Sequence, residues 1–336
     1  MYSLIRALLF RLEPELAHSL TLRLIQLAGG TPGVNRLLIS WYRVPEKKVN
    51  VFGLTYKNPV GLAAGYDKDG LGWRGLACLG FGHIEIGTVT LKPQPGNPKP
   101  RVFRLPDDRA LINRMGFPGV GARRILQRIT ARRSKDLVLG VNIGKNKDTP
   151  LETAAQEYME LVQIFYPLAD YLAVNVSSPN TVGLRRLQAR DTLDSLLKAL
   201  AAERMEQARK VGKTVPILVK LAPDLNDDEL EDALFAIQGN SMDGVIASNT
   251  TLSREGIKSP KSQEAGGLSG APLTLRSRAM VAKITRLTAG RLPVVGVGGI
   301  LTPTDAHAMF DAGATLVQVY TGLIYAGPGL VQNILK

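Results

Sequence analysis

The sequence has a single cysteine and only three histidines among its 336 residues. Cys78 has no second cysteine to pair with inside the chain, which excludes an internal disulfide framework and a cysteine-rich metal site and fits a reducing compartment. His18, His83 and His307 lie far apart in the sequence, so a metal centre built on histidines is not expected. We therefore predict a functional site that contains no metal.

Long apolar runs are also lacking. No run approaches the roughly 20 residues that a membrane-spanning helix requires. The first apolar block, Ala7 to Phe10, is short, is flanked by Arg6 and Arg11, and has no small-residue cleavage site, which argues against a secretory signal. The protein is therefore expected to be cytosolic or peripheral to a membrane.

Acidic residues are scarce relative to basic ones. The 42 Lys and Arg against 29 Asp and Glu leave a formal net charge of +13. Such a charge favours anionic ligands, anionic lipid headgroups or nucleic acid, although a solvated basic surface explains it equally well. Nucleic acid is the weakest of these interpretations and is not expected as a partner, because the basic pairs Arg123-Arg124, Arg132-Arg133 and Arg185-Arg186 are short and dispersed.

Residues 1–45 have a helical apolar periodicity of their own. The pattern is interrupted at Glu13-Pro14, where Pro14 suits the first turn of a second helix. The first stripe consists of Leu4, Ile5, Leu8, Leu9 and Leu12, and the second of Leu16, Leu20, Leu24 and Leu27. Two amphipathic helices with interspersed arginines can dock on a domain or lie in a membrane interface, and periodicity alone favours docking.

From about residue 50 onward, short apolar runs alternate with amphipathic stretches. Eight runs have the composition of buried parallel strands: Val60–Gly65, His83–Thr90, Val138–Gly144, Tyr171–Val176, Pro216–Ala222, Gly244–Asn249, Pro293–Gly299 and Leu316–Thr321. The helical stretches between them include Glu152–Tyr166, Leu193–Val211, Glu229–Gln238, Leu275–Leu287 and Pro303–Ala312. The pattern predicts an α/β protein, a (β/α)8 TIM barrel over residues 46–336 with an N-terminal two-helix amphipathic extension over residues 1–45.

Two insertions interrupt this alternation. Residues 91–136 separate the second and third predicted strands. Gly266 to Gly270 is expected to form a second, flexible insertion between the sixth and seventh. Loops of this length in a compact fold are usually lids or binding loops.

Polar residues follow every predicted strand, at the end where the active sites of such barrels lie. They are Asp67 and Lys68, Thr88, Asn142 and Lys145, Asn175, Ser178 and Asn180, Lys220, Ser248, Asn249 and Thr250, Gly298 and Gly299, and Tyr320, Thr321 and Gly322. The same pattern on all eight strands predicts one central site. The glycine-containing ends of the last two strands favour a phosphate site, although a tight turn also needs glycine for its geometry.

The turn from Asn175 to Thr181 combines amides and hydroxyls with no acid and no imidazole. These groups suit a neutral, hydrogen-bonding heterocycle better than a metal, and Ser178 would have to act without a neighbouring histidine. Lys68 and Lys220 would bring charge into this ring of amides. A lysine inside a barrel is costly unless it meets an anion, which for either residue could be a ligand or a salt-bridge partner. For Lys68 that partner could be Asp67 or Asp69.

Several motifs together resemble the dihydroorotate dehydrogenase family. They are Ala64 to Asp69 (AGYDKD), Glu85 to Thr90 (EIGTVT), Leu111 to Phe117 (LINRMGF), Val141 to Asn146 (VNIGKN), Asn175 to Thr181 (NVSSPNT), Asn249 to Thr251 (NTT), Gly266 to Gly270 (GGLSG) and Gly296 to Ile300 (GVGGI). Each motif is modest alone, but eight in the right order are specific. The resemblance extends from about residue 48 to the end of the sequence.

The resemblance implies an FMN enzyme that oxidises (S)-dihydroorotate to orotate in pyrimidine synthesis. The residues it places around FMN are Ala64, Gly65, Tyr66, Asp67, Lys68, Thr88, Asn142, Asn175, Lys220, Ser248, Gly270, Gly299, Tyr320 and Thr321. Those it places around the substrate are Lys68, Asn113, Arg114, Met115, Gly116, Phe117, Asn175, Asn180, Asn249 and Thr250. Ser178 would remove the C5 proton and pass it on through water or Thr181.

The N-terminal helices, together with Ser178 where another class carries cysteine, resemble the membrane-associated, quinone-dependent class 2. That class implies a membrane quinone as the terminal acceptor, with His18 and Arg104 as candidate contacts, although His18 could equally be a plain helix-surface residue. It also implies a peripheral protein on the cytoplasmic side of the cell membrane. The oligomeric state stays open, with a monomer as one option.

Two other interpretations stay open, namely a related FMN barrel with a soluble acceptor and a non-catalytic barrel that binds a membrane surface. Three positions depart from the family pattern: Tyr66, Pro118-Gly119 and Ser248. None removes a catalytic group, but Pro118-Gly119 leaves the conformation of the substrate lid open.

Overall fold

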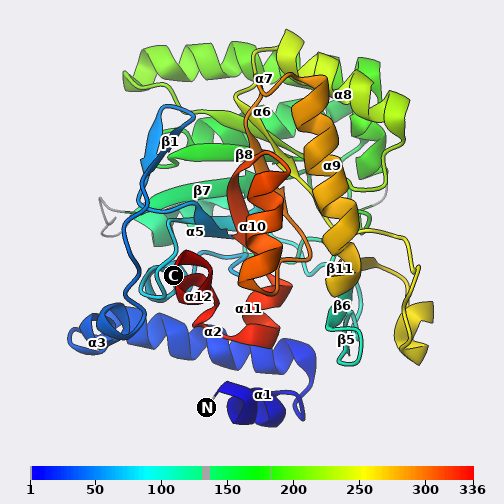
Figure 1. Cartoon of the computed structure of the whole chain (residues 1–336). Coiled ribbons are helices and arrows are strands. Elements are labelled where there is room, and N and C mark those ends of the chain that lie inside the picture. The colour runs from blue at the N-terminus through cyan, green and yellow to red at the C-terminus, as the bar shows by residue number, and fades with distance from the viewer. Residues whose placement is uncertain (1, 131–136, 182) are drawn as a thin grey trace.

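A closed barrel of eight parallel strands forms the centre of the protein in the computed structural model, which describes residues 2–130, 137–181 and 183–336 (Figure 1). Around the barrel the strands are β3 (Val60–Leu62), β4 (His83–Val89), β7 (Val138–Ile143), β8 (Tyr171–Asn175), β9 (Ile217–Leu221), β10 (Gly244–Ala247), β12 (Val294–Val297) and β13 (Ala314–Val319), and β13 pairs with β3. Each coincides with one predicted run, so the predicted barrel is confirmed.

The strands are near-continuously apolar because both of their faces are covered. Helices pack outside the barrel, and a separate apolar cluster that includes Tyr171, Leu218 and Leu316 fills its interior. The helices are α4 (Trp73–Ala77), α5 (Ala122–Thr130), α6 (Ala154–Phe165), α7 (Arg190–Val211), α8 (Asp227–Gly239), α9 (Thr274–Leu287), α10 (Pro303–Asp311), α11 (Thr321–Ala326) and α12 (Leu330–Leu335). Four short 3-10 turns, η1 to η4, span Leu151–Thr153, Leu184–Gln188, Pro260–Gln263 and Ala271–Leu273.

A hairpin of β1 (Val49–Val51) and β2 (Leu54–Tyr56) closes the end of the barrel at which the strands begin. Its apolar side chains pack against the interior cluster, and the ring of Tyr56 lies edge-on to that of His83, with the centroids 5.3 Å apart. The interior is thus sealed at this end, and the opposite end stays available for a site.

The two insertions form one small sheet. β5 (Val102–Leu105), β6 (Ala110–Asn113) and β11 (Gly267–Gly270) pair antiparallel in the order β11-β6-β5. The expectation that Gly266 to Gly270 is a flexible insertion was therefore wrong, because its backbone is hydrogen-bonded to β6 along the whole strand. The end of the first insertion, including Arg132-Arg133, lies outside the described residues.

The N-terminal extension contains three helices rather than the predicted two: α1 (Tyr2–Leu9), α2 (Pro14–Gly30) and α3 (Val34–Trp41). Pro14 stands in the first turn of α2 as expected, and the Glu13 side chain accepts the N–H groups of Glu15 and Leu16. The helices lie together beside the carboxyl ends of the barrel strands, with α1 outermost (Figure 1).

The docked face of α2 is not the predicted leucine stripe. Ala17 and Leu22 are buried, whereas Leu16, Leu20, Leu24 and Leu27 are each 44–65% exposed. The helix approaches α4 so closely that a Cβ on Gly75 would come within 2.0 Å of the Ile25 carbonyl oxygen. Close backbone contact therefore selects the side of α2 that carries Ala17, Leu22 and Ile25, and the four leucines of the predicted stripe stay exposed.

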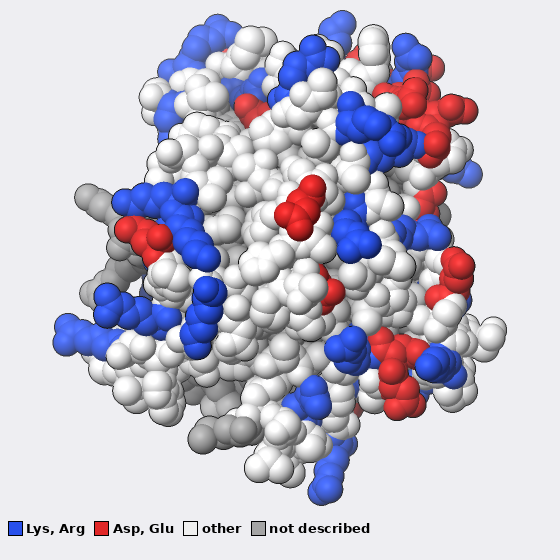
Figure 2. Space-filling model, viewed as in Figure 1, with Lys and Arg blue, Asp and Glu red and all other residues white. Residues whose placement is uncertain are grey.

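Lys and Arg lie in separate groups over the face seen in Figure 2, with Asp and Glu among them, and the described residues on this face form no continuous basic stripe. Among the described residues, no helix combines the length and apolarity needed to span a bilayer, and no group of His, Cys, Asp and Glu could hold a metal ion.

Candidate active site

A cavity opens at the carboxyl end of the barrel, where loops from the strands and the small sheet meet. It encloses about 970 Å³ of space, part of it open to solvent. Its walls include most of the predicted site residues: Ala64, Gly65, Lys68, Thr88, Asn113, Met115, Gly116, Phe117, Asn175, Ser178, Asn180, Lys220, Ser248, Asn249, Thr250, Gly270, Gly299, Tyr320 and Thr321. The carboxyl ends of parallel strands meet at one rim, which brings together residues separated by more than 250 positions in the sequence.

Four of the residues predicted to contact FMN or the substrate do not line this cavity. The Asp67 carboxylate accepts the backbone N–H groups of Leu71 and Gly72, each at 2.8 Å, so it shapes the loop after β3 instead. Arg114 points away, pairing with Glu264 at 2.7 Å. The other two are Asn142, which lies behind the wall, and Tyr66, which lines a neighbouring cavity. Lys145, also noted at a strand end, donates to three backbone carbonyls of its own loop.

Amide side chains on one wall are joined into a hydrogen-bonded network. Asn249 Nδ2 donates to Ser177 Oγ at 2.9 Å, and Ser177 Oγ donates to Asn175 Oδ1 at 2.9 Å. Asn180 Nδ2 donates to Asn113 Oδ1 at 3.3 Å across the loop from the small sheet. Because each amide is held by a neighbour, the orientation of its donor and acceptor is set before a ligand arrives.

Ser178 lies in this wall with only 5% of its surface exposed. Its Oγ accepts the backbone N–H of Asn180 at 3.2 Å. A donor aimed at this oxygen favours negative charge developing on it when its proton leaves. None of the three histidines lines the cavity, so the serine has no imidazole partner there. Thr181 Oγ1 is buried nearby in sequence and has no hydrogen-bond partner among the described residues.

Lys68 projects into the cavity from the loop after β3. Its Nζ donates to the Gly65 carbonyl at 2.7 Å, and the described residues offer it no ion pair, so the salt bridge considered with Asp67 or Asp69 does not form. Burial lowers the pKa of Lys68 to about 8, a shift that the charge of Glu15 opposes. A lysine held in this way provides a cation for an anionic ligand.

Lys220 has the salt-bridge partner that Lys68 lacks. Its Nζ lies 3.5 Å from Glu85 Oε1, and Glu85 is fully buried. Glu85 also accepts hydrogen bonds from the side chains of Asn142, Tyr171 and Gln318 at 2.8, 3.0 and 2.8 Å. Lys220 therefore combines an internal ion pair with a place in the cavity wall.

Glu85 is the residue that the sequence reasoning missed. The sequence did contain an indication, because an acid in the middle of the apolar run His83–Thr90 is buried and needs a cation or hydrogen-bond donors inside the barrel. Through Asn142, which accepts the Thr88 hydroxyl at 2.6 Å, Glu85 also orients the base of the cavity.

Glycines line the end of the cavity near β12 and β13. Gly298 and Gly299 have φ values of 114° and 72°, and a Cβ on Gly299 would lie 2.3 Å from Thr274 Cα. Tight packing thus requires glycine here in any case. The resulting bare backbone faces the same space as the hydroxyls of Ser248, Ser269 and Thr321. This set of N–H and hydroxyl groups has the chemistry of a phosphate cradle.

A second cavity lies beside the first, between α2 and the small sheet. It encloses about 1790 Å³, part of it open to solvent, and shares Lys68, Asn113, Met115, Ser269 and Tyr320 with the first cavity. The two spaces are therefore separated by single side chains.

His18 and Arg104 both line this second cavity. The His18 ring lies edge-on to Tyr66, with the centroids 5.1 Å apart, and Tyr66 lies edge-on to Tyr320 at 5.9 Å. Burial, together with the charge of Lys68, lowers the pKa of His18 to about 4. Arg104 donates to the Leu12 carbonyl at 2.7 Å and so holds the α1–α2 connection.

Comparison with known proteins gives one consistent family. Residues 47–336 match the family described as dihydroorotate dehydrogenase. A protein of Burkholderia thailandensis named dihydroorotate dehydrogenase (quinone) is 50% identical over all of this chain and 96% of its own length. A protein of the same name from Acidithiobacillus ferrooxidans is 48% identical over all of this chain and 93% of its own.

Solved structures agree with the sequence comparison. A crystal structure of DHODH from Eimeria tenella in complex with ferulenol superposes with a TM-score of 0.86 at 39% identity, covering 96% of this chain and 89% of that one. A ligand-free structure from the same organism has a TM-score of 0.81 at 40% identity and covers 90% of this chain and 93% of that one.

Proposed function

The chain belongs to the dihydroorotate dehydrogenase family, and from that premise we propose that it oxidises (S)-dihydroorotate to orotate with a quinone as the terminal electron acceptor. In this role it serves pyrimidine synthesis. The proposal includes FMN as the hydride acceptor in the barrel cavity and a peripheral attachment to a membrane.

The observation that carries the proposal is that four asparagines, Ser178 and Lys68 line one cavity. Dihydroorotate presents ring carbonyls and N–H groups, and a primary amide offers both a donor and an acceptor to them in a fixed planar arrangement. The linked amides of Asn175 and Asn249 are already oriented for this task. Lys68 supplies the cation for the substrate carboxylate.

Ser178 is the proposed base for the proton at C5. A hydroxyl is a weak base, so its proton must move onward as charge develops, either to water or to the buried hydroxyl of Thr181. The N–H of Asn180 donates to Ser178 Oγ and stabilises negative charge there. Ser178 is itself 5% exposed, so its hydroxyl is largely shielded from bulk water.

The residues of the cavity fit FMN. The bare backbone at Gly298–Gly299 and the hydroxyl of Thr321 would hold its phosphate, and Thr88, Asn175 and Lys220 would hold its ring. When bound, the flavin would accept the hydride from C6 of the substrate. Lys220, held in place by Glu85, would stabilise negative charge on the ring. Gln318 also lines this space, and its Oε1 is a buried acceptor without a hydrogen-bond partner among the described residues.

The second cavity is the proposed quinone site. Phe10, Ala17 and Leu22 provide apolar walls, while His18 and Arg104 provide polar contacts. The exposed leucines of α2 lie on the same helix and would rest in the membrane interface, so a lipid-borne quinone could enter without crossing water.

The test is a visible spectrum of the purified protein under anaerobic conditions. We expect flavin absorption that bleaches on addition of dihydroorotate and returns on addition of a short-chain quinone. A colourless protein that binds membranes would favour a non-catalytic barrel. Bleaching that only a soluble acceptor reverses would favour a related enzyme of the same fold.

A further inference from the structure

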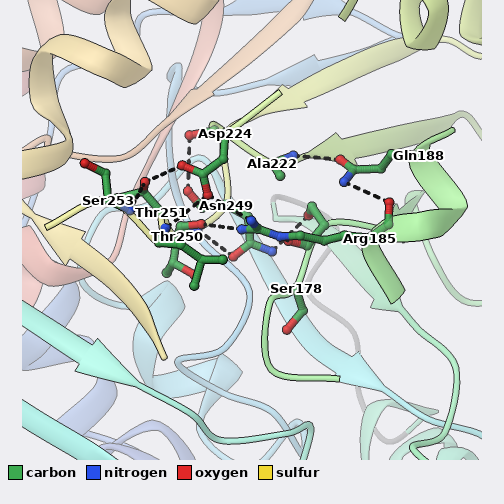
Figure 3. A network of polar contacts seen from close by, with 12 residues as sticks. Ser178, Arg185, Gln188, Ala222, Asp224, Asn249, Thr250, Thr251 and Ser253 are labelled. Atoms are coloured by element: carbon green, nitrogen blue, oxygen red, sulfur yellow. Dashed lines mark hydrogen bonds and ion pairs between the residues drawn. The ribbon is translucent and has the colours of Figure 1, made fainter. Parts of the chain in front are cut away.

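Arg185 is a half-buried cation outside the cavity that no step of the proposed reaction uses. It lies in η2, seven residues after Ser178, and its side chain is 22% exposed. Its guanidinium makes three contacts, each to the loop that follows a different barrel strand. Figure 3 shows these contacts beside Ser178, whose hydroxyl points away from the guanidinium.

The first two contacts are to backbone carbonyls. Arg185 Nε donates to the Ser177 carbonyl at 3.0 Å, and Nη2 donates to the Thr250 carbonyl at 3.0 Å. The Ser177 carbonyl belongs to the peptide plane that ends in the nitrogen of Ser178, so fixing it restricts the direction of the Ser178 side chain. Thr250 is itself part of the cavity wall, after β10.

The third contact anchors the guanidinium. Arg185 Nη1 lies 2.9 Å from Asp224 Oδ2, in the loop after β9. Asp224 is held by the hydroxyl of Thr251 and by the N–H of Leu252 at 3.0 Å. Burial opposes ionisation of Asp224, but these hydrogen bonds and Arg185 more than offset it and lower its pKa. The anchor is therefore charged at neutral pH.

We propose that Arg185 is a positioning residue that sets the distance and angle between Ser178 and the substrate-reading residues Asn249 and Thr250. The planar guanidinium holds its N–H donors in fixed relative directions, so this one side chain connects the loops after β8, β9 and β10 in a defined geometry. The proposal rests on the proposed function, since it assigns Arg185 to proton removal by Ser178.

The chain provides a matched control. Arg204 also pairs with an aspartate, at 2.7 Å from Asp243, and also donates to a backbone carbonyl, that of Ser241 at 2.9 Å. Its side chain is 14% exposed. Asp243 lies just before β10, at the opposite end of the barrel from the cavity. We therefore expect loss of Arg204 to lower the stability of the protein by a similar amount, with the contacts of the Ser178 loop unchanged.

The experiment compares Arg185→Lys and Arg185→Gln with Arg204→Gln and the parent holoenzyme. Stopped-flow absorbance separates flavin reduction by dihydroorotate from reoxidation by a short-chain quinone, and FMN content, orotate affinity and Tm are measured on each protein. For both Arg185 variants we expect flavin reduction to slow by about 10- to 100-fold, because small misplacements of a reacting group have effects of this size. Reoxidation and FMN content should stay within about twofold of the parent.

A substrate deuterated at C5 gives a kinetic isotope effect on flavin reduction, which a purely structural role of Arg185 would leave unchanged. If Ser178 is displaced, proton removal becomes slower relative to the other steps, so the isotope effect on flavin reduction should increase in Arg185→Lys. Arg204→Gln should lower Tm to a similar degree and leave both half-reactions unchanged.

The proposal is overturned if Arg185→Lys and Arg185→Gln reduce flavin within about twofold of the parent rate. It is also overturned if both half-reactions and FMN content decline together, since that indicates general loss of structure. Failure of the proposed function gives a different result, because the parent flavin would then not be reduced by dihydroorotate at all.

Discussion

Glu15 and Arg101 form an ion pair, 2.9 Å apart, that connects the first turn of α2 to the loop before β5. The same guanidinium donates to the carbonyls of Pro95 and Asn97 at 2.7 and 2.9 Å. Asn97 in turn donates to the carbonyl of Asn180, at 3.2 Å, in the wall of the first cavity. The N-terminal extension is thus joined to the loop that carries the proposed base, and its charge also acts on Lys68.

The charge of Lys68 should control orotate affinity. Because burial lowers its pKa to about 8, the side chain is charged at pH 7 and becomes neutral as pH rises through 8. The Kd of orotate for oxidised enzyme should be flat below pH 7 and rise by about tenfold per pH unit well above 8. Flavin absorbance during titration measures this. His18, with a pKa of about 4, does not titrate in this range, and equal affinity from pH 7 to pH 10 would rule out the carboxylate contact.

The substitution Glu15→Gln should shift this pH dependence to lower values. The Glu15 carboxylate is the neighbouring charge that raises the pKa of Lys68 most, whereas Arg101 lowers it. Without Glu15, only the smaller effects of Asp69 and Asp67 oppose burial and Arg101. Orotate affinity should then begin to decline below pH 8. Glu46→Gln is the control, because Glu46 pairs with Lys48 on the surface. An unchanged onset in Glu15→Gln would show that α2 has no electrostatic effect on the cavity.

Replacement of Ser178 by alanine should reduce turnover strongly and leave FMN bound. Loss of a positioned general base typically reduces the rate by about 10²- to 10⁴-fold. Ser178→Cys should keep partial activity, since a thiol is more acidic than a hydroxyl. The measurement is single-turnover flavin reduction from pH 6 to 10, and near-parental rates in Ser178→Ala across that range would remove Ser178 from the mechanism.

The Glu85–Lys220 pair should contribute to stability as a unit. Glu85→Gln leaves a buried cation without its partner and should lower the free energy of unfolding by about 3 kcal/mol. The double variant Glu85→Gln/Lys220→Met should lose less than the sum of the two single variants, because the uncompensated charge is gone. Urea denaturation of all four proteins completes the cycle, and additive losses would show that the two side chains do not interact.

Removal of residues 1–44 should slow the second half-reaction much more than the first, when the first is measured at pH 7 with saturating dihydroorotate. The truncated protein loses α1 to α3 and with them the wall of the second cavity that contains His18, while the first cavity keeps all of its walls. Flavin reduction by dihydroorotate should therefore persist, and reoxidation by quinone should slow. Arg101→Gln in the full chain is the control, because it removes the ion pair with Glu15 and keeps α1 to α3. Equal reoxidation rates in the truncated and full proteins would place quinone elsewhere.

The sequence by itself determined the barrel and which residues lie at the carboxyl ends of its strands. Parallel strands covered on both faces must be apolar throughout, so eight such runs could be recognised locally, and the rule that their carboxyl ends meet identified Asn175, Ser178 and Asn249 as neighbours. Pro14 likewise marked the start of α2, because its fixed φ is a local property.

Only the tertiary structure decided which of these side chains face the cavity and which residues neutralise the buried charges. Whether Gly267–Gly270 is a loop or a strand depends on Ala110–Asn113, more than 150 residues away, and the docked face of α2 depends on Gly75 of another helix. The partnerships of Glu85 with Lys220 and of Arg185 with Asp224 are equally non-local. Hydrophobic periodicity records burial along one element, whereas pairing of backbone edges and of buried charges is a property of two elements brought together.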